Sequence, residues 1–316
     1  MFSVIIPLYN KAPYIQRAVD SVLKQTFQDF EIIVVNDGST DGGEQLLESY
    51  SDNRIKLINQ NNQGVSIARN TGIKHAKFTY IAFLDADDYW HNSYLETNKT
   101  LIKLYPRVGI IGTGYTSGLF DTSDEFNYSL LNNYFEIAIH NTLYFTSATT
   151  INKVFFENNM GFDPGLKLGE DLDLWFRAIL YFGDGLYVPK KLVFYGNEDE
   201  NRATNKKYSF NDTLVAKISK SNYFDDVNIQ PTISRNKFEL FRDKWLYFNI
   251  FPLYQIKSNK SALEKMISDL GGRLYMIRIF YLLPFGILNK IFSINIIAKF
   301  FRNYMKFCFR FIYNLK

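Results

Sequence analysis

The sequence has few cysteines and histidines, the residues that form disulfides and that bind the metal in many metal centres. Among 316 residues there are one cysteine, Cys308, and three histidines. A single cysteine excludes an intramolecular disulfide and any zinc site made from several cysteines. Only 8 prolines and 18 glycines accompany 47% hydrophobic residues, which excludes a collagen-like or disordered chain. The length favours about two domains with a sizeable core.

Familiar nucleotide motifs and long apolar runs are also missing. No Gly-x-Gly-x-x-Gly follows the first predicted strand, and no Gly-x-x-x-x-Gly-Lys-Ser/Thr occurs anywhere. Before Leu270, no apolar stretch approaches the roughly 20 residues that a bilayer span needs. The first ten residues have no basic region and reach Pro7 quickly, so we expect them to form a strand and not a signal peptide.

Charge is distributed unevenly. The net charge is +4, yet residues 270–316 carry eight basic and no acidic residues, which leaves the remainder with a net charge of −4. An acidic body argues against a protein that binds nucleic acid over its whole surface, and indicates one basic surface with a local role.

What is present is an alternation of strand and helix patterns. Apolar runs typical of buried strands alternate with helical patterns, and the last of these strands ends in carboxylates. This order predicts an α/β fold with a mostly parallel central sheet flanked by helices. A strong helix is expected over residues 170–182, a strand pair or edge strand over 187–196, and mainly helices after about residue 213. The early strands are expected within 2–10, 30–37, 54–60 and 80–88, and the helices within 15–23, 41–50 and 64–76.

Three carboxylates follow the fourth predicted strand. Asp85, Asp87 and Asp88 stand in "FLDADDYW". Crowded carboxylates resist ionisation unless a cation compensates, and Mg²⁺ or Mn²⁺ takes carboxylate and phosphate oxygens. The alternative is a solvated acidic turn or a helix N-cap by Asp87 or Asp88. Ligands of open α/β sheets gather beyond the carboxyl ends of strands, which favours a metal site.

Two further acidic positions have both a functional and a structural interpretation. Asp37 in "VVNDGSTD" ends a strand and could accept hydrogen bonds from a nucleotide base, or it could serve only turn chemistry. Glu170 and Asp171 begin a predicted helix, where they could provide a general base or merely suit the helix dipole.

Together these motifs resemble a known family. "VIIPLYN", "VVNDGSTD", "NNQGVSIARNTGIKHA", "YIAFLDADD" and "GFDPGLKLGEDLDLWFRA" occur in the order and spacing of inverting family 2 glycosyltransferases of the GT-A fold. The resemblance covers roughly residues 2–200. Five ordered motifs make it far more specific than any one of them.

The resemblance implies a set of donor-binding residues. Pro7 and Tyr9 match the point where the family's first strand meets the nucleotide. Asp37 matches the carboxylate that binds the base, typically uracil. Arg69 and Asn70 match the helix beside the nucleotide.

It also implies residues for the metal and for the reaction. Asp87 matches the direct ligand of a divalent cation, Mn²⁺ or Mg²⁺, and Asp85 would lie near the ribose. Asp171 matches the catalytic base, with Glu170 as its neighbour. An acceptor hydroxyl would displace the nucleoside diphosphate in one step, with inversion and without an enzyme nucleophile.

The chain departs from the family pattern after the strand that ends near Tyr195. Many relatives have Tyr-Arg and then a histidine that helps to bind the metal or diphosphate, but here Gly196 follows Tyr195 and no histidine is near. Phe78 replaces a frequent glycine, which we interpret as local packing. The Gln-x-x-Arg-Trp signature of processive synthases is absent, so a single addition is expected. Candidates to replace the histidine are Glu198, Asp199, Asn201 and Arg202.

These patterns define the expected organisation. Residues 1–205 would form the GT-A catalytic domain, with a donor half to about residue 107 and an acceptor half over 108–205. Residues 206–316 would form a mainly helical C-terminal region. Its last part, 270–316, has 12 aromatic residues among 47, interleaved with the basic ones. This favours interfacial helices on a membrane; the alternatives are a helical pair packed on the catalytic domain, or a membrane span.

The expected function is therefore transfer of a sugar from a nucleotide-sugar donor, UDP-linked by family analogy, to a glycan or lipid-linked acceptor. The expected place is the cytoplasmic side of the cell membrane, peripherally bound, in the synthesis of surface polysaccharide. One alternative is a metal-dependent nucleotidyltransferase, which would leave "GEDLDLW" without a role. The other is a non-catalytic protein that binds nucleotide-sugars.

Overall fold

The computed structural model describes residues 1–316 except 124, 197–206, 221, 224–234 and 314–316. The substitutes considered for the missing histidine, Glu198 to Arg202, lie outside the described residues, as does the expected boundary at residue 205.

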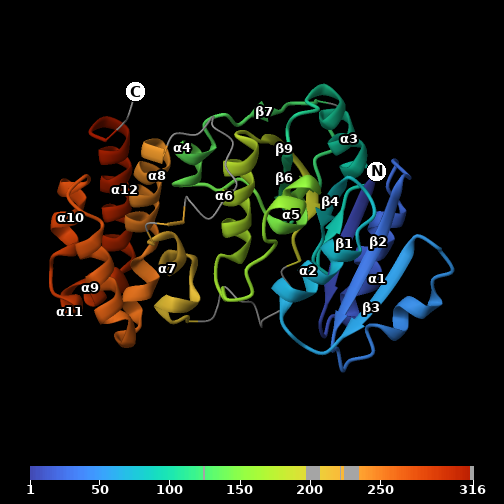
Figure 1. Cartoon of the computed structure of the whole chain (residues 1–316), viewed down its shortest axis with the longest axis horizontal. Helices are drawn as coiled ribbons and strands as arrows, with labels where there is room; N and C mark the ends of the chain where they lie inside the picture. The colour runs from blue at the N-terminus through green and yellow to red at the C-terminus, as the bar shows by residue number, and fades with distance from the viewer. Residues whose placement is uncertain (124, 197–206, 221, 224–234, 314–316) are drawn as a thin grey trace.

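The strands of the described ranges form one nine-stranded sheet, in the part of the molecule that holds the N-terminus (Figure 1). Its strand order is β3-β2-β1-β4-β8-β6-β9-β5, and β7 also pairs with β9. The strands β3, β2, β1 and β4 are mutually parallel, whereas β8, β5 and β7 pair antiparallel to their neighbours. The expected α/β class is confirmed, but the sheet is mixed beyond β4. The strands are β1 (Phe2–Leu8), β2 (Phe30–Asp37), β3 (Ile55–Gln60), β4 (Tyr80–Phe83), β5 (Tyr89–Trp90), β6 (Ile110–Thr116), β7 (Ser129–Leu130), β8 (Thr149–Asn152) and β9 (Leu186–Phe194).

Helices connect and cover the strands. Before residue 197 these are α1 (Ala12–Leu23), α2 (Val65–His75), α3 (Tyr94–Leu104), α4 (Tyr134–Ala138), α5 (Val154–Asn158) and α6 (Glu170–Phe182), with 3₁₀ turns η1 (Gln45–Ser49) and η2 (Thr146–Ala148). In the C-terminal part they are α7 (Leu214–Ile218), α8 (Arg235–Asn249), α9 (Lys260–Asp269), α10 (Tyr275–Tyr281), α11 (Phe285–Ser293) and α12 (Asn295–Phe311), with 3₁₀ turns η4 (Phe210–Asp212), η5 (Phe251–Gln255) and η6 (Lys257–Asn259).

The sheet is covered on both faces because its strands are apolar on both. Val4 and Ile6 of β1 face the cluster that contains α1 and α3, whereas Ile5 faces the cluster that contains α2 and α6. Successive side chains of a strand point to opposite faces, so an unbroken apolar strand needs a cover on each side. Helix α1 supplies one cover with Ile15, Ala18, Val19 and Val22, which are buried as their spacing predicts.

The C-terminal helices gather at the end of the molecule away from β1–β3 (Figure 1). Their buried side chains, from Phe238 of α8 to Phe309 of α12, belong to the same apolar cluster as Ile5 of β1 and Trp175 of α6. The helical region therefore shares one core with the sheet. None of the helices in the described ranges is by itself both long and apolar enough to span a bilayer; α10 and α11 meet that criterion only as a pair, with a 99° bend between them.

Candidate functional site

The predicted donor residues lie where neighbouring parallel strands end. Strand β1 lies between β2 and β4, and all three run in the same direction. Asp37 ends β2, Pro7 is the penultimate residue of β1, and Asp85 lies two residues beyond β4. Tyr9 follows β1 with an exposed side chain. The topology thus brings the motifs to one sheet edge, where ligands of open α/β sheets bind.

Asp37 is buried and holds the loop between β3 and α2. Its Oδ1 accepts hydrogen bonds from Gln60 Nε2 at 2.7 Å and the Gln63 backbone N–H at 2.9 Å, and its Oδ2 accepts one from the Gly64 N–H at 2.8 Å. Turn chemistry is therefore part of its role. A carboxylate has about four acceptor positions, so Oδ2 keeps capacity beyond these three contacts. Contact with a nucleotide base stays a prediction.

Arg69 of α2 joins the donor carboxylates to the start of α6. Its side chain is only 5% exposed; Nη2 donates to Asp85 Oδ1 at 2.6 Å, and Nη1 lies 3.7 Å from Glu170 Oε1. The guanidinium also stacks over the Phe162 ring at 5.0 Å. Nε and Nη1 have no hydrogen-bond partner among the described residues. Buried donors without partners are costly, so this position suits an anionic or oxygen-rich ligand.

Asp87 is held by two basic residues of the β1–α1 segment. Lys11 Nζ lies 2.5 Å from Asp87 Oδ2, and Arg17 Nη2 donates to the Asp87 carbonyl at 2.8 Å. The side chain of Asp87 stays 26% exposed. It is thus both accessible and already partly neutralised.

Asp88 turns inward and fixes this loop. Its Oδ2 accepts a hydrogen bond from Ser147 of η2 at 2.5 Å, and its Oδ1 accepts one from the Gly196 N–H at 2.8 Å. Burial, and then the charge of Asp85, raise the pKa of Asp88 well above its ordinary value. Ser147 also accepts a hydrogen bond from the Asp85 N–H at 3.0 Å. Asp88 and Ser147 position the carboxylates beside them.

Gly196 has a steric reason for its place in the sequence. A Cβ at this position would collide with the Asp87 carbonyl oxygen. The chain after β9 therefore approaches the Asp87–Asp88 turn more closely than any side chain would allow. This accounts for glycine where many relatives have arginine.

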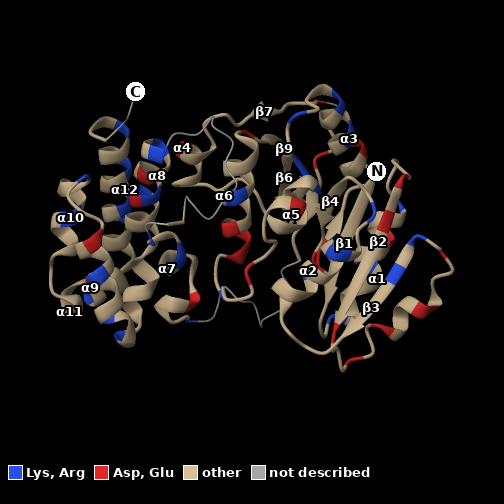
Figure 2. Ribbon diagram, viewed as in Figure 1, with Lys and Arg blue, Asp and Glu red and all other residues tan. Residues whose placement is uncertain are grey.

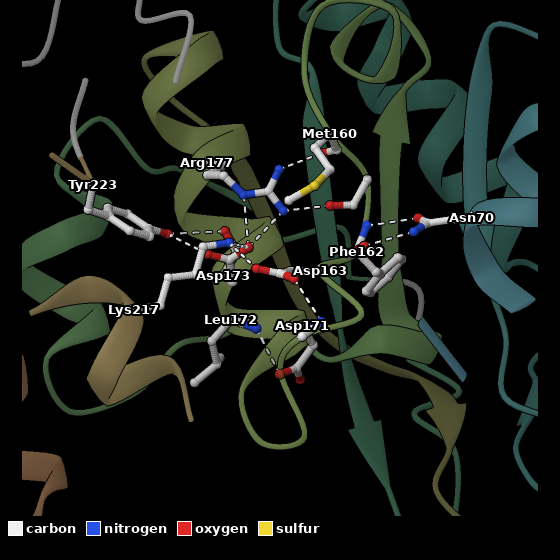
Figure 3. Close-up of polar contacts among 12 residues, drawn as sticks. Asn70, Met160, Phe162, Asp163, Asp171, Leu172, Asp173, Arg177, Lys217 and Tyr223 are labelled. Carbon is white, nitrogen blue, oxygen red and sulfur yellow. Dashed lines mark hydrogen bonds and ion pairs between the residues drawn. The ribbon is translucent and has the colours of Figure 1, made fainter. Parts of the chain in front are cut away.

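Asn70 ties α2 to the loop before α6. Its Nδ2 donates to the Phe162 carbonyl at 2.7 Å, and its Oδ1 accepts from the Phe162 N–H at 2.8 Å (Figure 3). The side-chain amide is thus committed to the backbone of residue 162, which gives Asn70 a positioning role. Direct contact with a nucleotide stays a prediction.

The predicted base stands at the first turn of α6. Gly169 caps the helix with φ of +86°, a left-handed conformation, and a Cβ there would come within 2.8 Å of Leu214 Cβ. Asp171 Oδ1 accepts the Leu172 N–H at 2.7 Å (Figure 3). Burial, followed by the charge of Glu170, raises the pKa of Asp171 to about 6. A carboxylate with that pKa is largely ionised at neutral pH and can still take up a proton.

A buried ion network supports this turn from behind. Asp173 is fully buried and lies 2.8 Å from Arg177 Nη2, 2.9 Å from Lys217 Nζ and 3.0 Å from the Tyr223 hydroxyl. Lys217 of α7 also contacts Asp163 at 2.8 Å (Figure 3). The network thus links α6, the loop before it and the C-terminal helices.

The expected divalent cation would be held mainly by the phosphates of the nucleotide-sugar and by few protein side chains. Within the described part of the chain, no three His, Cys, Asp or Glu side chains converge as a metal cage. An accessible carboxylate at Asp87 nevertheless fits the way Mg²⁺ binds, through one or two carboxylates and substrate phosphates. Lys11 would have to move away from Asp87 Oδ2 before this carboxylate oxygen could bind the cation.

Sequence reasoning missed Lys11, Arg17 and Ser147. Lys11 is the residue before α1 and Arg17 lies within α1, and a cation so close after the first strand was a usable signal. Ser147 lies about 60 residues from the carboxylates it contacts and gave no local signal.

Comparison with known proteins agrees with this geometry. A family model described as glycosyl transferase family 2 matches residues 3–165. The uncharacterized glycosyltransferase RP339 of Rickettsia prowazekii is 30% identical over 226 residues, which are 67% of this chain and 70% of that protein. EpsJ of Bacillus subtilis is 52% identical over 91 residues, 28% of this chain and 26% of EpsJ. GlyA of Streptococcus pneumoniae is 33% identical over 211 residues, 61% of this chain and 30% of GlyA. The chain thus spans less than a third of EpsJ and of GlyA.

Solved structures show the fold. Residues 1–349 of S. aureus TarS in complex with UDP-GlcNAc align with a TM-score of 0.71 and 20% identity, covering 98% of this chain and 91% of that one. A mannosyltransferase of Pyrobaculum calidifontis, in complex with GDP-Man and Mn²⁺, aligns with a TM-score of 0.55 and 17% identity, covering 96% and 83%. The expected GT-A fold with a helical C-terminal region is confirmed.

Proposed function

The chain belongs to glycosyl transferase family 2, and on that premise we propose that it moves a sugar from a UDP-linked donor to a hydroxyl of a glycan or lipid-linked acceptor, with inversion. The observation that carries the proposal is the bridge made by Arg69. Arg69 contacts Asp85, which lies beyond the carboxyl end of β4, and faces Glu170, the neighbour of Asp171. This bridge supports a single site in which the proposed donor carboxylate and the proposed base act together.

The donor half supplies contacts to the nucleotide and its diphosphate. Asp37 stands at the end of β2 with acceptor capacity for the base, and Asp85 lies nearer the centre of the sheet edge. Nε and Nη1 of Arg69, which make no hydrogen bond within the described residues, are suited to an oxygen of the sugar or diphosphate. UDP is the proposed nucleotide because TarS, which shares the fold, is described with UDP and UDP-GlcNAc.

The acceptor half supplies the base. In the proposed reaction the acceptor hydroxyl attacks the anomeric carbon, its proton passes to Asp171, and the bond to the nucleoside diphosphate breaks on the opposite face. Glu170 and burial keep Asp171 basic enough to take the proton, while Arg69 limits how far its pKa rises. A divalent cation held by Asp87 would supply charge neutralisation for the leaving diphosphate.

We also propose that the protein works at the cytoplasmic face of the cell membrane, in the making of surface polysaccharide. Support comes from the basic, aromatic composition of residues 270–316.

A product assay tests the reaction. Thermal shift with a panel of nucleotide-sugars and Mn²⁺ selects the donor, and product analysis follows with that donor. Release of UDP that depends on Asp171 supports sugar transfer. Release of pyrophosphate would support nucleotidyl transfer, and donor binding without any product would support a non-catalytic binding protein.

A further inference from the structure

Helix α12 has a face that anchors it to the body of the protein. Phe301, Met305, Cys308 and Phe309 are buried in the main apolar cluster. Phe301 packs on Phe251 of η5 at 5.6 Å, and Phe309 packs against His140 at 5.9 Å. Helix α12 is therefore a fixed part of the fold and not a detached tail.

A second face of α12 is apolar and exposed. Ile296, Phe300, Phe307 and Phe311 recur at intervals of four, seven and four residues, which places them within an arc of about 60° and along about 22 Å of helix. Ile296 is 81% exposed and Phe300 73%. We call these four residues the α12 stripe. Burial of the helix thus accounts for one apolar face and leaves another in solvent.

Basic residues line one side of this stripe. Lys299, Lys306 and Arg310 are exposed and lie within an arc of about 40°, roughly a quarter turn from the stripe. Figure 2 shows Lys and Arg along α12, and residues 270–316 contain no acidic residue. An apolar face beside a purely cationic one is the pattern of helices that lie in a membrane interface.

Helix α10, a neighbour of α12, also has exposed apolar residues. Tyr275, Ile279 and Leu282 are exposed and recur at helical intervals of four and three. Phe280, which follows Ile279, packs on Phe301 of α12 with 5.0 Å between the ring centroids, so the two helices are neighbours. Of the 24 exposed large apolar residues in the described ranges, 13 lie between Tyr275 and Ile312. Such concentration marks an interaction surface.

We infer that the α12 stripe, extended by α10, docks on an anionic lipid bilayer, with Lys299, Lys306 and Arg310 against the headgroups. Lipid is favoured over a protein partner because protein interfaces are depleted in lysine, whereas here Lys299 and Lys306 flank the apolar residues and residues 270–316 contain no acid. The inference deepens the membrane location proposed above and rests on that proposal, but not on the transfer reaction.

Vesicle co-sedimentation of the full chain tests the inference, without donor or acceptor. The probes are vesicles of phosphatidylcholine alone and of phosphatidylcholine with 30% phosphatidylglycerol, a composition of about that order being anionic enough for basic segments to respond. The stripe variant is Phe300→Ser with Phe307→Ser, and the charge variant is Lys299→Gln with Lys306→Gln and Arg310→Gln. The matched control is Leu104→Ser with Leu119→Ser, two exposed leucines far from α12 in sequence.

The parent and the control should bind anionic vesicles and bind neutral ones far less. The charge variant should lose roughly a hundredfold in partitioning, and binding of the parent should weaken with salt. The stripe variant should lose at least about tenfold, with an unchanged melting temperature because both residues are exposed. A parent that ignores anionic vesicles, or a stripe variant that binds like the parent, overturns the inference. Loss of a dimer in the stripe variant, without vesicle binding by the parent, would assign the surface to a second copy instead. UDP release measured in parallel distinguishes this failure from failure of the proposed reaction.

Discussion

Burial has the largest effect on the pKa of Asp171, and the charges of Glu170 and Arg69 change it further with opposite signs. Glu170 raises the pKa of Asp171 by repulsion, whereas Arg69 lowers it by attraction. Because Arg69 also contacts Asp85, the donor edge and the base are electrostatically coupled. A ligand that occupies Arg69 would therefore also be sensed at Asp171.

Activity should depend on pH through Asp171. A base must be ionised, so kcat/KM should fall as pH drops below about 6, and not near 4 as for an ordinary aspartate. Glu170→Gln removes a repulsive charge, lowers the pKa of Asp171 and should move this acid limb to lower pH. The check is a pH–rate profile of both proteins; an unmoved limb, or one moved to higher pH, would contradict the assignment.

Asp87 should be needed for metal-dependent turnover. Asp87→Ala removes the accessible carboxylate and should reduce the rate about a hundredfold or more, with weaker donor binding. The assay is UDP release across a Mn²⁺ titration. Glu157→Ala, an exposed carboxylate on α5, serves as the control. Full activity of the parent in EDTA would refute the metal role.

Sequence predicted residues whose role follows from a strand end or a helix start. Asp37 and Asp85 stand at or just after the ends of parallel strands, and the topology alone brings such ends together. Asp171 stands in the first turn of a helix, which its sequence pattern predicts. Asn70 was placed on the right helix, but its contact with the Phe162 backbone depends on a loop 92 residues away. No local pattern encodes such a partner.

At the scale of elements, the first turn of α6 depends on its connection to α7. Asp173 neutralises Arg177 and Lys217 in a fully buried position. Arg177 in turn donates to the carbonyls of Met160 and Gly161, at the start of the loop that leads to Asp171. The network thus holds in place the loop and the helix turn that carry Asp171.

Removing the Asp173 charge should destabilise the fold. Asp173→Asn leaves the buried Arg177 without its carboxylate and the half-buried Lys217 with only Asp163, which should cost about 3 kcal/mol in the free energy of unfolding. Urea unfolding is the measurement. Lys167→Gln, which breaks the more exposed pair with Asp212, should change stability by less than about 1 kcal/mol. Equal effects of the two substitutions would show that the network carries no special weight.

Long elements with a clear apolar pattern were predictable from the sequence, and short elements were not. The buried pattern of α1 and the continuous apolar run of β2 agree with expectation. The helix expected over 41–50 is only a 3₁₀ turn, Gln45–Ser49, with a single buried residue, Leu47. Strands β5 and β7 have two residues each, too few for any period to show.

At the scale of the whole molecule, the C-terminal helices belong to the core. Ile277, Tyr281, Leu288 and Met305 are buried in the cluster that also contains strand residues such as Ile5. The two interpretations of this region, packed helices or a membrane surface, are therefore compatible, since α12 has a face for each.

Deleting the chain after Leu270 should consequently damage the protein. The truncation would expose the apolar faces of α8 and η5 that α10–α12 cover, and we expect insoluble or partly unfolded protein. Solubility and circular dichroism give the measurement. A soluble, cooperatively folded truncation that still binds UDP would show that the helices are dispensable for the catalytic fold.

The most direct test is sugar transfer by Asp171→Asn, because the substitution keeps the shape of the side chain but removes its charge and its ability to take a proton. With the donor selected by thermal shift, UDP affinity should stay within about twofold of the parent, while sugar transfer should fall by about 10²–10⁴-fold. Transfer at the parental rate would contradict the account and assign the base to another residue, with Glu170 as the first to examine.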